Sequence, residues 1–335
     1  MKLALFSSKS YDSEYFQISN KRFDHHITYF ETRLRSRTAH LVDGFDAVCV
    51  FVNDVLDKET VGILKSRGVK VIALRCAGFN NVDLEAAFEA GIKVVRVPAY
   101  SPESVAEHAL ALILTLNRKT HKAYNRVREG NFSLERLTGF NLTGKTVGVI
   151  GTGKIGASFA RIMLGMGCIV LANDHYPNEA LRMAGVKYVE LEALLSGADI
   201  ISLHCPLTPE TSYMVNKKTL KMMKPGVMII NTSRGALINT HDVIKSLKNS
   251  DVGYLGVDVY EQEEKLFFKD HSEEILQDDE IARLMSFPNV LITAHQAFFT
   301  REALSQIAST TLQNLTDFEN GLELVNEINY NAPNT

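Results

Sequence analysis

Three glycines and one acid in the middle of the chain have the spacing of a dinucleotide-binding turn. Residues 146–156 read Thr-Val-Gly-Val-Ile-Gly-Thr-Gly-Lys-Ile-Gly, so Gly151, Gly153 and Gly156 lie between an apolar run and a predicted helix. Glycine at these positions allows a tight turn, lets a pyrophosphate approach the backbone, and lets the helix pack closely on the sheet. The unpaired amides at the start of that helix favour phosphate groups. The pattern predicts a dinucleotide cofactor.

The residue at the end of the next apolar run decides which dinucleotide is favoured. Asp174 follows Gly153 by 21 residues, where its carboxylate can accept hydrogen bonds from a ribose diol. This predicts NAD. His175 comes directly after Asp174 and leaves NADP open, because an imidazolium would tolerate a 2′-phosphate.

Polar residues also follow other apolar runs, at positions where parallel strands would bring them to one edge of a sheet. Hydride addition to a ketone leaves an oxyanion that must be protonated, and His295 suits that role near neutral pH. Glu263 would hold the ring and favour its charged form, and Arg234 offers a fork of donors for a carboxylate or carbonyl. Asp258 either anchors these residues or hydrogen-bonds the nicotinamide side of the cofactor.

Each of these residues has a simpler interpretation when it is taken alone. An Arg or Glu in a loop is more often a solvated charge, and a single His after a strand is more often a capping group. Their occurrence at successive strand ends favours a shared site. His204 also follows an apolar run, but His-Cys-Pro-Leu-Thr-Pro-Glu-Thr predicts a loop beside the cofactor. The remaining histidines singled out, His25, His26, His108 and His121, are predicted to be structural.

Composition narrows the class of protein. The 335 residues are 45% hydrophobic, enough for two well-filled domains, and the net charge of −3 without a basic block argues against nucleic acid or an anionic membrane as a partner. The four cysteines form no CxxC pair and predict reduced core thiols and a cytoplasmic location. No signal peptide or membrane span is predicted, and no spacing suggests a metal site.

Short apolar runs alternate with helical patterns along the chain and predict parallel α/β sheets. The first series lies within the first hundred residues, at 2–6, 47–52, 70–74 and 93–97. The second contributes six predicted strands to a cofactor domain, at 146–150, 168–172, 199–203, 227–231, 254–258 and 290–293. Helices are predicted from Pro102 through Leu116, between the domains, and over 300–318. The charged stretch 265–280 is predicted to be a surface excursion. A return of the last helix to the first domain stays open at this point.

Several motifs carry a resemblance that covers nearly the whole length. They are the glycine turn with Asp174 and the segments 74–83, 97–102, 203–208, 231–235, 257–261 and 293–298. In these segments the chain resembles the D-isomer-specific 2-hydroxyacid dehydrogenases. Asp-Val-Tyr-Glu and His-Gln-Ala-Phe resemble more narrowly its fermentative D-lactate dehydrogenase branch.

The resemblance implies a fold and a set of roles. The fold is α/β, with two doubly wound parallel-sheet domains separated by a cleft: a flavodoxin-like substrate-binding domain of residues 1–100 and 299–335, and a Rossmann NAD-binding domain of residues 101–298. The implied catalytic residues are Arg234, Glu263 and His295. The implied cofactor positions are Gly151, Gly153, Lys154, Ile155, Gly156, Asp174, Cys205, Pro206, Thr232, Ser233, Arg234 and Asp258. The implied substrate positions are Ala77, Gly78, Tyr100, Arg234, His295 and Phe298.

These roles predict an NAD-dependent enzyme that reduces pyruvate to D-lactate, working as a homo-oligomer, a dimer or a tetramer. Two alternatives stay open. The same trio would reduce a bulkier 2-keto acid or hydroxypyruvate, although Tyr100 and Phe298 favour a small substrate. The fold would also serve an NAD-sensing interaction protein, which would bind NADH but oxidise it slowly.

Overall fold

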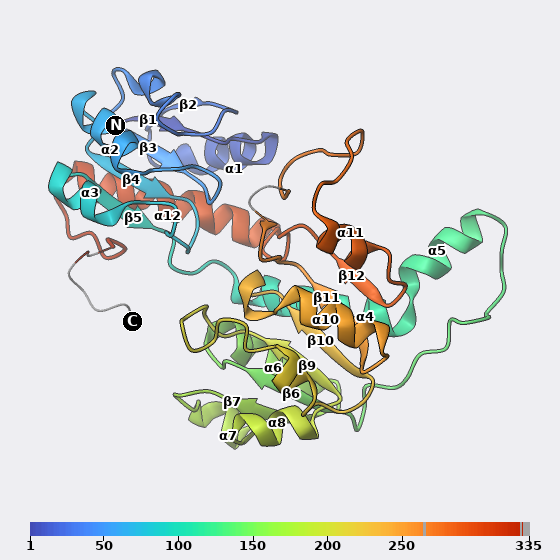
Figure 1. The fold of residues 1–335 in the computed structure, drawn as a ribbon. Helices are drawn as coiled ribbons and strands as arrows, with labels where there is room; N and C mark the ends of the chain where they lie inside the picture. The colour runs from blue at the N-terminus through green and yellow to red at the C-terminus, as the bar shows by residue number, and fades with distance from the viewer. Residues whose placement is uncertain (264–265, 329, 331–335) are drawn as a thin grey trace. The chain divides into compact units, whose positions relative to one another are not determined.

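A computed structural model describes residues 1–263, 266–328 and 330 (Figure 1). The chain divides into two compact units. Unit 1 consists of Met1–Ser101 and Phe299–Thr335, and unit 2 of Pro102–Phe298. Each unit is built around one parallel β-sheet, so the polypeptide passes from one unit to the other twice.

The sheet of unit 1 has five strands in the order β2-β1-β3-β4-β5, and every pairing is parallel. Its strands are β1 Lys2–Leu5, β2 His26–Tyr29, β3 Ala47–Val50, β4 Val71–Leu74 and β5 Lys93–Arg96. This is the flavodoxin-like strand order. All residues of β3 and β4 are buried, as expected for central strands covered on both faces.

Helices cover both faces of this sheet. One face packs against η1 Ala39–Val42, α2 Lys58–Ser66 and α3 Leu84–Ala90, and the other against α1 Ser10–Asn20 and α12 Arg301–Glu319. Thr300 caps α12 by accepting a hydrogen bond from the amide of Ala303. The last long helix of the chain therefore belongs to the same unit as the first strand.

The sheet of unit 2 has seven parallel strands in the order β12-β11-β10-β9-β6-β7-β8. Its strands are β6 Thr146–Ile150, β7 Ile169–Asn173, β8 Lys187–Tyr188, β9 Ile200–Leu203, β10 Val227–Asn231, β11 Val252–Val257 and β12 Val290–Ile292. The strand order reverses between β6 and β9. In a doubly wound sheet, a ligand binds beyond the carboxyl ends of the strands at this point.

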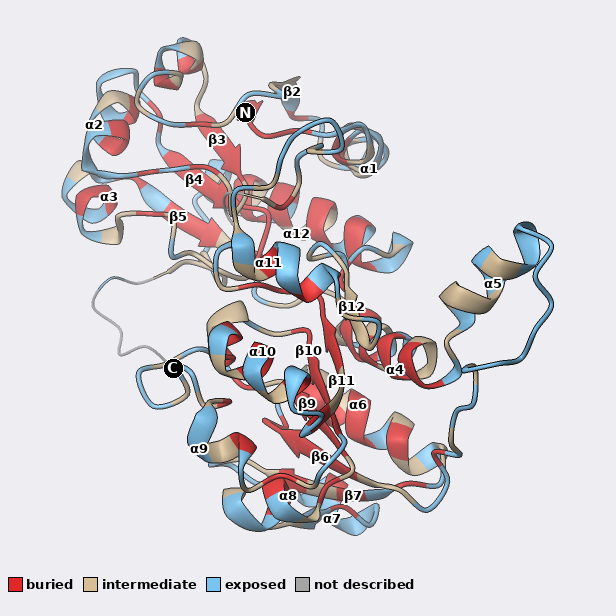
Figure 2. Ribbon diagram, turned by 45° about the vertical axis from the view of Figure 1, so that its right-hand side comes forward, coloured by how far each residue is buried: buried red, intermediate tan, exposed pale blue. Residues whose placement is uncertain are grey.

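Helices again form two layers, and the central strands between them are buried (Figure 2). One layer contains α4 Pro102–Arg118, α6 Lys154–Gly165 and α7 Glu179–Met183, and the other α8 Leu191–Gly197, α9 Lys217–Leu220, α10 Thr240–Lys248 and α11 Asp279–Met285. A short 3₁₀ turn, η2, spans Gly235–Leu237. Helix α5, Thr120–Arg128, extends away from the rest of unit 2 and buries none of its residues (Figure 1).

The prediction of two doubly wound parallel sheets is confirmed, and every predicted apolar run contains a strand. The predicted number of strands was wrong in both series. Strands β2 and β8 were missed, so unit 2 has seven strands instead of six. Both lie at sheet edges, and β8 is only Lys187–Tyr188, too short and too polar to produce an apolar run.

The charged stretch 265–280 is more than the predicted surface excursion. Lys265 lies outside the described residues, but Phe267 is buried and packs with Tyr260 and Ile281 in a small apolar cluster. The hydroxyl of Tyr260 donates to both carboxylate oxygens of Asp278, at 3.0 and 2.9 Å. The segment is therefore anchored through the apolar residues scattered between its charges.

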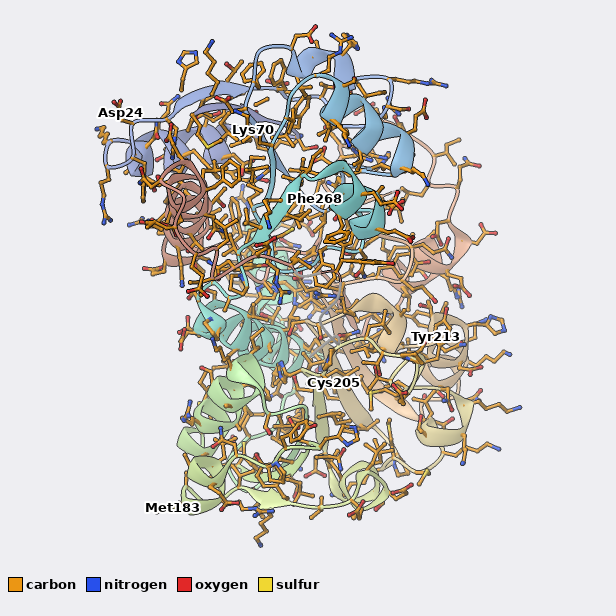
Figure 3. All side chains as sticks on the ribbon, turned by 90° about the vertical axis from the view of Figure 1, so that its left-hand side faces the viewer. Asp24, Lys70, Met183, Cys205, Tyr213 and Phe268 are labelled. Atoms are coloured by element: carbon orange, nitrogen blue, oxygen red, sulfur yellow. The ribbon has the colours of Figure 1, made fainter. Side chains whose placement is uncertain are left out.

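All four cysteines are buried, as predicted, and none of them is joined in a disulfide. In Figure 3, Cys205 lies among the buried side chains of unit 2, whereas Met183 projects from its surface. Within the described part of the chain, no helix combines the length and the apolar character needed to cross a membrane.

Candidate active site

The glycine turn connects β6 to α6 at the reversal point of the unit 2 sheet. Gly151 has φ of 88°, a left-handed conformation that favours glycine. A Cβ at Gly156 would lie 1.9 Å from the carbonyl oxygen of Gly151, so the helix can approach the turn only because residue 156 has no side chain. A Cβ at Gly153 would meet nothing within 4 Å. Two glycines therefore serve packing, and the third leaves open space at the start of α6.

Asp174 lies at the end of β7, directly beside this turn. Its Oδ2 accepts hydrogen bonds from the amide of Thr152, at 2.5 Å, and from the Thr152 hydroxyl, at 3.0 Å. Its Oδ1 accepts from the amide of Tyr176 at 2.8 Å. The carboxylate is thus fixed next to the glycine turn, where an acid that binds a ribose is needed.

The loops after β9 and β10 border the same edge of the sheet. Ser233 donates a hydrogen bond from its hydroxyl to the carbonyl of Cys205 at 2.7 Å, which joins the two loops. The hydroxyl of Thr232 is buried and has no hydrogen-bond partner among the described residues. A buried polar atom without a partner is costly unless a ligand satisfies it. This observation, with the open space at Gly153, fits a dinucleotide at this edge.

His204 lies in the loop after β9, as its motif predicts, and this loop borders the glycine turn, while the His204 ring packs against Phe159. The His204 ring is half-buried, with its centroid 4.9 Å from that of the Phe159 ring and its Nε2 2.8 Å from the Ser202 hydroxyl. Burial lowers the pKa of His204 to about 3, so the ring is neutral. Both the backbone and the Cβ of His204 border the glycine turn, 2.7 Å from where a Cβ of Gly151 would be and 3.2 Å from where a Cβ of Gly156 would be.

The structure brings together His295 and Glu263, the predicted proton donor and its carboxylate partner. Nδ1 of His295 lies 2.8 Å from Oε1 of Glu263, although the two residues are 32 positions apart. The second carboxylate oxygen of Glu263 accepts a hydrogen bond from the amide of Tyr260 at 3.0 Å, which fixes the carboxyl group. Both side chains are about one quarter exposed, 24% for His295 and 23% for Glu263. Because Nδ1 is engaged, Nε2 of His295 is the atom available to a substrate.

Asp258 anchors the loop that carries His295. Its carboxylate accepts hydrogen bonds from the Thr293 hydroxyl at 2.5 Å and from the amides of Gln296 and Ala297 at 2.9 and 2.8 Å. Its carbonyl accepts from the amide of His295 at 2.7 Å. Burial raises the pKa of Asp258, but these hydrogen bonds and one from His108 outweigh burial and leave it below its ordinary value. Of the two predicted alternatives, the geometry matches the anchoring role.

Arg234 follows β10, two strands away from β12 in the sheet order. Its side chain is exposed, and one terminal nitrogen donates to the carbonyl of Ser233 at 2.8 Å. Gly235, the next residue, packs directly on the backbone of Tyr260, where a Cβ would lie 2.0 Å from the carbonyl carbon. That close approach joins the Arg234 loop to the segment that leads to Glu263.

The predicted substrate positions belong to both units. Ala77 and Gly78 follow β4 in unit 1, where the guanidinium of Arg96 donates to the carbonyl of Ala77 at 2.9 Å. Tyr100 lies at the end of the first segment of unit 1. Phe298, the last residue of unit 2, is buried.

Sequence reasoning missed the contact of His108 with this site. His108 was predicted to be merely structural, yet its Nε2 lies 3.0 Å from the Thr293 hydroxyl and 3.5 Å from Oδ1 of Asp258. The only signal in the sequence is an imidazole on the apolar face of a helix, which must find a partner when it is partly buried. The identity of a partner 185 residues away cannot be read from that signal.

No group of three or more His, Cys, Asp or Glu side chains that could hold a metal ion occurs in residues 1–263, 266–328 and 330.

The chain is similar to known proteins over most of its length. Residues 110–297 match the family model for the D-isomer specific 2-hydroxyacid dehydrogenase NAD binding domain. The chain is 55% identical to the D-lactate dehydrogenase of Escherichia coli K12 over 98% of its own length and all of the relative's. It belongs to the D-isomer-specific 2-hydroxyacid dehydrogenase family. The identification confirms the resemblance found in the sequence, and the matched region, which includes the turn at Gly151, is an NAD binding domain.

Solved structures support the same family membership. The apo structure of D-lactate dehydrogenase from E. coli superposes with a TM-score of 0.91 at 52% identity, covering 98% of this chain and all of that one. The pyruvate reductase of Chlamydomonas reinhardtii gives 0.94 at 45% identity, covering 97% of this chain and 98% of that one. The family fold thus extends over both units of the chain.

Substitution at the glycine turn tests the cofactor site. We expect Gly156→Ala to weaken NADH binding by about tenfold or more, because its Cβ would push the start of α6 away from Gly151, and 1.4 kcal/mol already corresponds to tenfold. Titration of NADH fluorescence measures the affinity. Gly165→Ala, in the same helix with nothing within 4 Å of its Cβ, is the matched control. Equal affinity in both variants would contradict the packing role of Gly156.

The neutral state of His204 predicts a pH-dependent stability. Its pKa is lowered in the folded state, so its contribution is complete above the unfolded value and is lost as pH falls from about 6.5 toward 3, by up to about 1.4 kcal/mol per pH unit. We expect His204→Gln to flatten this part of the stability profile. Urea unfolding at several pH values measures the difference from wild type. Parallel profiles would show that the imidazole does not remain neutral in the folded protein.

Proposed function

We propose that this protein is an NAD-dependent D-lactate dehydrogenase that reduces pyruvate. The observation that carries the proposal is the 2.8 Å contact between His295 and Glu263 at the carboxyl edge of an NAD-binding sheet. An imidazole paired with a carboxylate is a proton donor suited to neutral pH. The full-length similarity to a D-lactate dehydrogenase and to a pyruvate reductase supports pyruvate as the substrate.

The chain's own residues supply a binding group and a proton donor. NADH, when bound, supplies the hydride that adds to the carbonyl carbon. Arg234 holds the keto acid through its planar fork of donors and polarises the carbonyl. His295 donates the proton on Nε2 to the carbonyl oxygen, while Glu263 stabilises the charged ring through Nδ1. The balance is pyruvate + NADH + H⁺ to D-lactate + NAD⁺.

In this proposal, residues around the glycine turn and at the carboxyl ends of the unit 2 strands hold the dinucleotide. The amides at Lys154 and Ile155 face the pyrophosphate, Asp174 binds the adenosine ribose, and Thr232 gains a partner for its buried hydroxyl. Asp258 acts by anchoring the loop of His295. Cys205, Pro206 and Ser233 line the same edge through the loop contact described above.

Unit 1 recognises the substrate in the same proposal. The backbone amides of Ala77 and Gly78 bind the substrate carboxylate, and Tyr100 and Phe298 restrict the size of its side chain. A bulkier 2-keto acid is the second candidate, because a D-2-hydroxyisocaproate dehydrogenase superposes with a TM-score of 0.88 at 30% identity. We also infer a cytoplasmic location, supported by four cysteines that are in no disulfide, and a homo-oligomeric assembly, a dimer or a tetramer.

A direct assay tests the reaction. Purified protein with pyruvate and NADH should lose absorbance at the NADH band and form only D-lactate, which stereospecific enzymes identify. A series of 2-keto acids with longer side chains should show falling kcat/KM if the pocket is small. Absence of turnover with tight NADH binding would instead support the NAD-sensing alternative, and L-lactate as product would contradict the proposal.

The roles of the acid pair predict a graded loss of activity. His295→Gln should lower kcat by about 100-fold or more while NADH still binds, because general acid catalysis contributes factors of that size. Glu263→Gln should lower kcat less, because it removes the charge that favours the protonated ring but leaves the ring in place. His241→Gln, which alters an exposed His–Glu pair 3.6 Å apart, is the control and should keep full activity. Steady-state kinetics measures all three, and normal turnover of His295→Gln would remove this residue from the mechanism.

A further inference from the structure

The loop of His295 has a backbone conformation that needs support. His295 has φ of 52°, in the left-handed region that only a small fraction of non-glycine residues adopt, although histidine does so more often than most. Such a conformation is less favourable than an ordinary helical or extended one and persists when the surroundings impose it. The proton donor is therefore placed by its neighbours, and its position depends on the strength of the contacts around it.

Those contacts converge on one carboxylate. Asp258 is fully buried, and the hydroxyl of Thr293, two residues before His295, donates to it at 2.5 Å. The amides of the two residues after His295 donate to the same carboxylate. The backbone on both sides of His295 is thus held at Asp258.

The single hydrogen of the Thr293 hydroxyl determines that His108 is the donor in the contact between them. A hydroxyl has one hydrogen, and that of Thr293 is directed to Asp258, so the Thr293 oxygen must accept at its 3.0 Å contact with His108. Nε2 of His108 therefore carries a hydrogen and is the donor. The chain of bonds runs from His108 on helix α4, through Thr293 and Asp258, to the backbone of His295.

The same bonds link the two passages of the chain between the units. Helix α4 begins at Pro102, directly after the first passage, and Ala297 lies immediately before the last residue of unit 2 at the second passage. His108 and Ala297 both contact the carboxylate of Asp258, at 3.5 and 2.8 Å. A change in α4 would accordingly reach the loop of His295 through a single group.

We propose that His108 is a positioning residue for the proton donor: its Nε2–H holds Thr293 against Asp258 and so maintains the conformation of the His295 loop. This inference rests on the proposed function, in which His295 protonates the carbonyl oxygen. His108 itself touches neither substrate nor cofactor in this role. Loss of its donor should slow proton transfer without weakening cofactor binding.

Variants that keep or remove the donor test the proposal. His108→Leu keeps much of the apolar volume but cannot donate, and we expect kcat to fall about 10- to 100-fold, the size of effect that a small misplacement of a catalytic group produces. His108→Gln carries an amide nitrogen near the position of Nε2 and should restore most of the activity. Glu107→Gln, an exposed neighbour on the same helix, is the control and should match wild type.

Two readouts separate positioning from loss of folded protein. The value of kcat is normalised to the number of NADH-binding sites, so an unfolded fraction does not count. The solvent deuterium isotope effect on kcat should rise in His108→Leu, because a misplaced donor makes proton transfer more rate-limiting. Thr293→Val should give a similar loss, and the double variant no further loss, because both residues act through the same bonds.

The results distinguish this inference from the proposed function. Normal kcat in His108→Leu, a loss that disappears on normalisation, or a His108→Gln variant as slow as His108→Leu would each overturn the positioning role while wild type still reduces pyruvate. Wild-type protein that does not oxidise NADH with pyruvate would overturn the proposed function first.

Discussion

The parallel arrangement of the strands is the constraint on which the site depends. Every pairing in the unit 2 sheet is parallel, so all strands run in the same direction and all their carboxyl ends lie on one side of the sheet. Residues separated by more than 100 positions, such as Gly151 and His295, are therefore delivered to the same carboxyl edge. Reversal of strand order between β6 and β9 opens that edge at the glycine turn, because the loops on the two sides run in opposite directions.

Glycine and aspartate residues have different structural roles at the carboxyl ends of these strands. Gly151, Gly156 and Gly235 allow backbones to approach within distances that any side chain would block. Asp174 and Asp258 then fix the resulting loops by accepting backbone amides. These contacts hold loops that have no regular secondary structure in a defined conformation.

Three histidines of unit 2, His108, His204 and His295, differ in their neighbours and therefore in their chemistry. His204 packs against Phe159 and is kept neutral by burial, which makes it a packing residue. His295 is about one quarter exposed, and its Nδ1 contacts the carboxylate of Glu263, so its Nε2 remains the atom available to a ligand. His108 lies between these cases, because its partner is a hydroxyl that is itself bound to a carboxylate. The residue type is the same in all three, and the neighbours decide the chemistry.

Local pattern in the sequence was sufficient for the fold class and the cofactor turn. Central parallel strands are covered on both faces, so they appear as apolar runs, and the turn at Gly151 needs glycine for reasons that act within a few residues. The positions of Arg234, Glu263 and His295 after apolar runs predicted a shared site, and the family resemblance implied the same three catalytic residues. The edge strand β8 left no apolar run, because it consists only of Lys187 and Tyr188 and neither residue is buried.

Beyond the predicted pair of Glu263 and His295, the tertiary structure decided which polar side chains meet. The sequence placed His204 and His295 at equivalent strand ends, but packing turned the first against Phe159 and the second toward Glu263. Likewise, His108 meets Thr293 and Asp258 because α4 packs across β10 and β11 in the folded unit. Hydrogen bonds act over about 3 Å, so contacts between residues far apart in the sequence are fixed only when the sheet and its helices have packed.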